Sequence, residues 1–170
     1  MKKPLIESID SLSAWSGKIS SYLIAATIIV IIPEVIARYA FGYSFMWIHD
    51  IVWFFCGALY MLGGAYTLLQ DGHVKVDIIY AQFKPRTRAI LDMITFTLFC
   101  AFCGTLLWQG VKLFWSSFQV LETTVTPWGG PVWLFKLTIP VGAFLILLQG
   151  LAKFIRDLKI VRGKEKKHAN

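Results

Sequence analysis

Charged residues are scarce in this chain. Asp, Glu, Lys and Arg make up 16% of its 170 residues, whereas a soluble domain carries about 25%. Hydrophobic residues make up 56%, and the mean hydropathy is +0.62. The segment 51–70 has no charged residue, and at about 1.5 Å per residue it is long enough to cross the hydrocarbon core of a bilayer. The composition therefore excludes an ordinary soluble domain and predicts an integral membrane protein.

The sequence also lacks the patterns that carry catalysis or bind cofactors. It has no nucleophile paired with a base, no phosphate-binding loop and no cluster of carboxylates. His49 and His73 lie near opposite ends of one predicted helix, about 36 Å apart, so they cannot ligate one haem. Cys100 and Cys103 form a C-x-x-C inside an apolar segment, but no further ligand is evident. We therefore predict no catalytic residue, no metal site and no cofactor.

Long apolar segments predict an all-α membrane protein with four transmembrane helices and short amphipathic helices at the membrane surface. We expect the spans at residues 19–37, 51–70, 89–114 and 131–154. Pro33 should kink the first span and Pro140 the fourth, because proline removes a helical hydrogen bond. The chain is predicted to be one domain, 1–170, made of an amphipathic N-terminal segment 1–18, the four spans within 19–155 and a basic tail 156–170.

Positive charge is distributed unevenly along the chain. Fourteen of the seventeen Lys and Arg residues lie before the first span, between the second and third spans, or from Lys153 at the end of the fourth span onwards. The positive-inside rule therefore places both termini and the middle loop in the cytoplasm. The formal net charge of +7 lies beside apolar spans, so it indicates contact with anionic membrane lipid rather than with nucleic acid.

Small and acidic residues recur along the second span. Asp50, Gly57, Gly64 and Asp71 are seven residues apart, a step that drifts by only about 20° around a helix, so the four share a narrow face. Such a face lets another helix approach closely. That helix could belong to a partner subunit or to another span of this chain.

Glu34 and Arg38 lie near the end of the first span. Being four residues apart, they can pair along one helix face. A carboxylate inside a membrane span is a functional candidate. The alternative is a paired charge at the membrane interface, which the position near the helix end favours.

Several short motifs follow one another in a distinctive order. They are Arg38-Tyr39-x-Phe41, Trp47-x-His49-Asp50, Gly63, Gly72-His73-x-x-Val76-Asp77 and Ile139-Pro140. In order and spacing they resemble the small membrane subunit of tripartite ATP-independent periplasmic (TRAP) transporters, the DctQ type. That family often has W-x-E-E where this chain has His49 and Asp50.

The resemblance implies a multi-pass subunit of the bacterial inner membrane that braces a large permease subunit. In this family the large subunit carries the substrate and sodium sites, and a periplasmic binding protein delivers an organic acid. The implied partners are therefore the large permease subunit, the binding protein and membrane lipid. The residues that we expect at subunit interfaces or in structural roles are Glu34, Arg38, Tyr39, Trp47, Asp50, Gly57, Gly63, Gly64, Asp71, Gly72, His73, Asp77 and Pro140.

Two other functions remain open from the residues alone. One is a four-helix membrane electron carrier or enzyme that uses His, Cys or Glu34, which a haem absorbance band or bound metal would indicate. The other is a stand-alone membrane regulator that binds lipid through its basic tail. Neighbouring genes for a large permease and a secreted binding protein would favour the transporter subunit.

Overall fold

The computed structural model describes residues 3–70 and 85–161. Four of its helical segments are long and apolar enough to cross a membrane, which confirms the predicted all-α fold with four spans. The helices are α1 (Lys3–Phe41), α2 (Met46–Leu69), α4 (Pro85–Gln119), α5 (Val132–Lys136) and α6 (Thr138–Val161).

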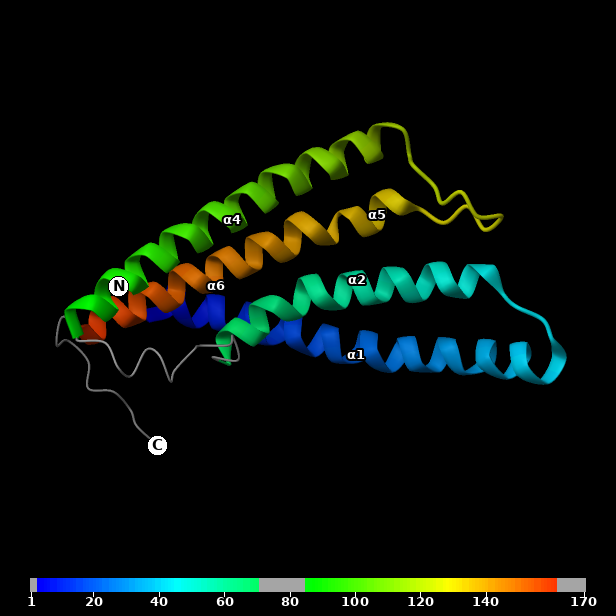
Figure 1. Cartoon of the computed structure of the whole chain (residues 1–170), viewed down its shortest axis with the longest axis horizontal. Helices are drawn as coiled ribbons and strands as arrows, with labels where there is room; N and C mark the ends of the chain where they lie inside the picture. Colours follow the sequence, from blue (N-terminus) through cyan, green and yellow to red (C-terminus); the bar gives the residue numbers. More distant parts are fainter. Residues whose placement is uncertain (1–2, 71–84, 162–170) are drawn as a thin grey trace.

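The spans form two helical hairpins that lie side by side (Figure 1). One hairpin is α1 with α2, and the other is α4 with α5 and α6. Helices α2 and α6 pack against each other in the middle, which leaves α1 and α4 at the two outer edges. The connections 42–45 and 120–131 lie together at one end of the bundle, here called the loop end, and the start of α1 and the end of α6 lie at the other.

Helix α1 differs from the sequence-based expectation. Residues 3–18 do not form a separate surface helix but continue into the first span. The helix runs through Pro33, where the expected kink stays a prediction. Its 39 residues reach about 58 Å, well beyond the hydrocarbon thickness of about 30 Å.

Buried polar contacts explain why the start of α1 stays in the bundle. The Ser13 hydroxyl donates a hydrogen bond to Gln149 of α6 (2.8 Å), and the Gln149 amide donates to Asp10 (3.0 Å). Arg156 of α6 forms an ion pair with the same Asp10 (3.0 Å). Ser13 and Gln149 are buried. Polar side chains of this segment therefore help to fix where it packs, together with the buried apolar side chain of Ile6.

Small residues bring α2 and α6 close together. A Cβ atom added at Gly142 of α6 would lie 2.6 Å from the Met61 carbonyl oxygen of α2. In the reverse direction, a Cβ at Gly64 of α2 would lie 2.7 Å from Cδ1 of Ile146. Ala65 and Ala143 are fully buried. Close helix approach through small residues is the usual packing of membrane helices, and here it joins the two hairpins.

The fourth span is interrupted close to Pro140, as expected. Helix α5 ends at Lys136 and α6 begins at Thr138. Since Pro140 has no N–H, it cannot donate to the carbonyl of Lys136, four residues earlier. A Cβ at Gly110 of α4 would lie 3.2 Å from the Pro140 nitrogen, so the interrupted segment packs closely on α4.

Candidate functional site

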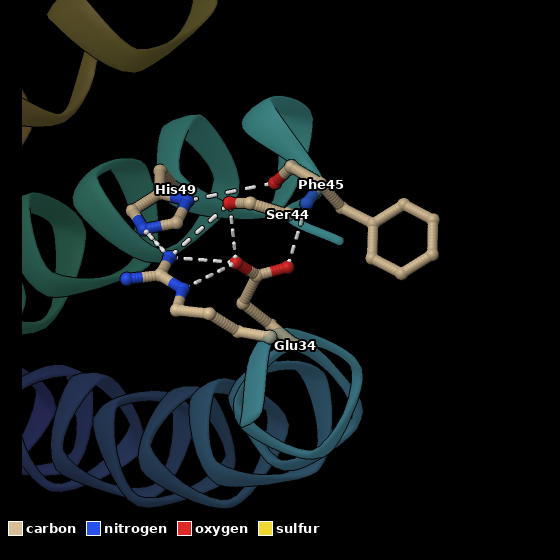
Figure 2. A network of polar contacts seen from close by, with 5 residues as sticks. Glu34, Ser44, Phe45 and His49 are labelled. Atoms are coloured by element: carbon tan, nitrogen blue, oxygen red, sulfur yellow. Dashed lines mark hydrogen bonds and ion pairs between the residues drawn. The ribbon is translucent and has the colours of Figure 1, made fainter. Parts of the chain in front are cut away.

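A cluster of polar side chains joins the end of α1 to the start of α2 (Figure 2). At its centre is Glu34, which is buried. The Glu34 carboxylate accepts hydrogen bonds from Arg38 Nη2 (2.6 Å), the Ser44 hydroxyl (2.8 Å) and the backbone N–H of Phe45 (2.8 Å). The predicted pairing of Glu34 with Arg38 is therefore confirmed, and two further donors share the same carboxylate.

The local sequence explains this arrangement. Gly42 has a φ of +65°, a left-handed conformation that glycine adopts without steric cost, and it lets the chain turn back towards α1. Phe45 is the N-cap of α2 and has no side-chain oxygen. Glu34 instead brings an acceptor and a negative charge to the helix N-terminus, where both are favourable. The carboxylate thus fastens α2 to α1.

His49 completes the cluster from the first turns of α2. Its Nε2 lies 2.7 Å from Nη2 of Arg38. Because a guanidinium can only donate, Nε2 must accept, and the imidazole proton is assigned to Nδ1, which faces the Phe45 carbonyl oxygen at 3.5 Å. Sequence reasoning missed this contact, although His49 in place of an acid was a visible signal.

A second polar cluster holds the connection 120–131. Glu122 accepts hydrogen bonds from the Lys136 ammonium and the Ser117 hydroxyl. These two bonds, that from Lys136 first, hold the pKa of the Glu122 carboxyl below its ordinary value. Asp50 of α2 accepts a hydrogen bond from Thr126. The loop is therefore attached to α4, to α5 and to the other hairpin.

The predicted small-residue face of α2 does not meet one neighbour. Asp50 contacts the loop through Thr126, a Cβ at Gly57 would have nothing within 4 Å, and Gly64 faces Ile146. Towards the loop end α2 and α5 lie further apart (Figure 1), and stacked aromatic rings of Phe54 and Phe135 join them there. The partner of Gly64 is therefore another span of this chain.

The remaining predicted residues lie in different surroundings. Tyr39 is 86% exposed and Trp47 42% exposed, and Gly63 faces the Ser20 side chain of α1. Four predicted residues lie outside the described part of the chain, namely Asp71, Gly72, His73 and Asp77. Among the residues that the structure describes, no three His, Cys, Asp or Glu side chains are grouped to hold a metal ion.

The polar clusters described above join helices to one another, an arrangement that suits a structural subunit. The family model for the DctQ component of tripartite ATP-independent periplasmic transporters matches residues 13–160, which covers the first span from Ser13 onwards and the whole of the other three. A search of curated proteins finds no match. The chain therefore belongs to the family of the DctQ component of TRAP transporters.

Proposed function

We propose that this small TRAP subunit braces the large permease subunit and does not bind the transported solute itself. The observation that carries the proposal is the use of the buried polar groups. Glu34, Gln149 and Ser13 are all buried, and each is hydrogen-bonded to another helix or to the next connection of the same chain. Their hydrogen bonds are used for fixing helices, which suits a brace better than a substrate site.

The transport reaction is inferred from the family. We propose a secondary transporter driven by sodium, in which a periplasmic binding protein delivers an organic acid to the large subunit. The basic segments of the chain support an orientation with both termini in the cytoplasm. The loop end would then face the periplasm, where the connections 42–45 and 120–131 can contact the binding protein.

The structure suggests different roles for the predicted residues. Glu34, Arg38 and Asp50 would hold the loop end, while Gly63, Gly64 and Pro140 would set distances between helices of this chain. Tyr39, Trp47 and Gly57 are exposed, so they are available to lipid or to a partner.

Uptake in proteoliposomes tests the proposal. The large subunit, reconstituted with and without this chain, would be supplied with the binding protein, a labelled organic acid and an inward sodium gradient. We expect co-purification of the two membrane subunits and uptake that requires both. Equal uptake by the large subunit alone would refute the bracing role, and a haem absorbance band in the purified chain would instead support the electron-carrier alternative.

A further inference from the structure

Polar side chains line one side of α4, the helix at one outer edge of the bundle. They are all exposed and comprise Thr105, Gln109, Lys112, Ser116 and Gln119. With about 100° per residue, they fall within an arc of about 80° and extend over about 21 Å. We call this set the α4 polar stripe.

The stripe lies inside a candidate membrane span. Within the described residues this span is Ile94–Gln119, which is part of the 35-residue helix α4. Counted from the midpoint of α4, Gln109 lies about 10 Å and Lys112 about 15 Å along the helix axis towards the loop end. Gln109 therefore lies within half the hydrocarbon thickness, about 15 Å, and Lys112 lies close to that limit. The Lys112 ammonium lies 4.9 Å from the centre of the Trp108 ring, one turn deeper. The Lys112 side chain therefore extends towards Trp108, which lies one helical turn further from the loop end.

Three members of the stripe, Gln109, Lys112 and Gln119, have no polar partner within the part of the chain that the structure describes. The hydroxyls of Thr105 and Ser116 donate to backbone carbonyls of α4 itself. Within the described part of the chain, however, Gln109 makes no hydrogen bond and Lys112 no ion pair. Hydrocarbon offers neither group a partner, and ionisable residues within membrane spans usually face protein or water. Lipid tails are therefore a poor neighbour for this face.

The opposite edge of the bundle makes a useful contrast. The exposed side chains of α1 within its span are predominantly apolar and include Ile24, Ile28, Ile29, Ile32 and Ile36. Such a face suits lipid. Beside the α4 polar stripe there is also a shallow depression of about 480 Å³, lined by Leu106, Gln109, Gly110, Lys112, Leu113 and Ser116. The α4 edge therefore offers both shape and polarity for a protein partner.

We propose that the α4 polar stripe is the docking face for a transmembrane helix of the large permease subunit. The docking helix carries a carboxylate at the level of Lys112 and a hydrogen-bonding side chain at the level of Gln109. Charge complementarity selects this occupant, because the unpaired ammonium needs an anion that a second apolar helix or a lipid tail cannot supply. The inference rests on the proposed function only in taking the large subunit as the partner.

Site-specific crosslinking tests this face directly. A photoreactive phenylalanine derivative would be placed at Gln109 and, as the matched control on the opposite edge, at Ile29, in the co-expressed two-subunit complex. We expect a crosslink to the large subunit from position 109 and none from position 29. A crosslink from position 109 to a second copy of this chain would overturn the proposal, as would one to the large subunit from position 29 alone.

Charge variants provide the second measurement. Lys112→Glu should lower the amount of large subunit that co-purifies by about tenfold, because it sets two carboxylates against each other, while Lys112→Arg should retain it. The control Tyr22→Glu changes an exposed side chain of α1 and should leave the amount unchanged. If Lys112→Glu co-purifies at the wild-type level, the face does not dock the large subunit. Failure of the wild-type subunits to co-purify would instead refute the bracing function.

Discussion

Replacing Gly142 with alanine would place a methyl group against the backbone of α2. The added Cβ would lie 2.6 Å from the carbonyl oxygen and 2.8 Å from the carbonyl carbon of Met61, where non-bonded heavy atoms normally lie about 3.5–4.0 Å apart. Since a helix backbone cannot turn aside as a side chain can, α2 and α6 would have to separate by about 1 Å.

The expected cost follows from two opposing effects. Overpacking a dense core costs about 1–3 kcal/mol, and a rigid backbone neighbour favours the upper end of that range. The change from glycine to alanine in a helix returns about 1 kcal/mol. We therefore expect Gly142→Ala to lower the free energy of unfolding by about 2 kcal/mol.

Two other glycines provide matched controls for the same substitution. A Cβ at Gly57 would have nothing within 4 Å, so Gly57→Ala should keep the gain of up to about 1 kcal/mol. A Cβ at Gly64 would meet Cδ1 of Ile146, the end of a flexible side chain that can rotate away. Gly64→Ala should fall between the other two variants, whereas Gly64→Leu should separate α2 from α6.

Unfolding in mixed micelles, followed by circular dichroism as the fraction of denaturing detergent is raised, measures these differences. The unfolding midpoint should be highest for Gly57→Ala, intermediate for Gly64→Ala and lowest for Gly142→Ala. Equal midpoints for Gly142→Ala and Gly57→Ala would refute the reasoning, because they would show that α2 and α6 do not approach as closely as described.

Three further predictions concern the loop end and the topology. Glu34→Ala should lower the unfolding midpoint more than Glu34→Gln does, because glutamine can still accept from the N–H of Phe45; equal losses would show that this bond contributes little. The lowered pKa of Glu122 should stabilise the fold above its ordinary pKa of about 4.5, and this stabilisation should be lost as the pH falls below that value. Glu122→Gln should remove this part of the pH dependence, so an unchanged pH profile of the unfolding midpoint would contradict the role of Glu122. Reporter fusions at Asn170 and in the Glu122 loop should report opposite compartments, with the C-terminus in the cytoplasm; a periplasmic C-terminus would contradict the proposed orientation.

The spans could be predicted because charge is excluded from hydrocarbon, but their ends could not be placed by the same rule. The charge of Asp50 predicts that the second span begins after this residue, yet α2 begins at Met46. The carboxylate of Asp50 is accommodated by Thr126, which arrives from a distant loop. Contacts of this kind depend on the tertiary fold and leave no local trace in the sequence.

The N-terminal segment shows a different limit. The amphipathic pattern of the segment 1–18 predicts an apolar face at the membrane surface, but the buried residues of this segment include Ser13 and Ser16 beside Ile6. Small polar residues at such spacing are also a signal for helix packing in membranes. Amphipathicity alone does not say which of the two faces is buried.

The polar cluster at Glu34 was only partly predictable. Its bond to Arg38 follows from a spacing of four residues in one helix. The contacts to Ser44 and His49 depend on the turn at Gly42. The backbone geometry of this turn cannot be predicted from the spacing of residues in the sequence. The small-residue face of α2 is predictable for the same reason as the ion pair, because both follow from the regular spacing of residues along a helix. The helix that covers this face can be identified only from the fold.

The hydrogen bond between Ser13 and Gln149 joins residues 136 positions apart. It can therefore form only after α6 has been synthesised. During synthesis α1 emerges long before α6, and contacts between residues far apart in the sequence form late. Until the last span has been inserted, Asp10 and Ser13 lack their partners from α6. In a product truncated before Gln149, Asp10 and Ser13 would therefore stay unpaired. Their exposure would distinguish an incomplete subunit from a finished one.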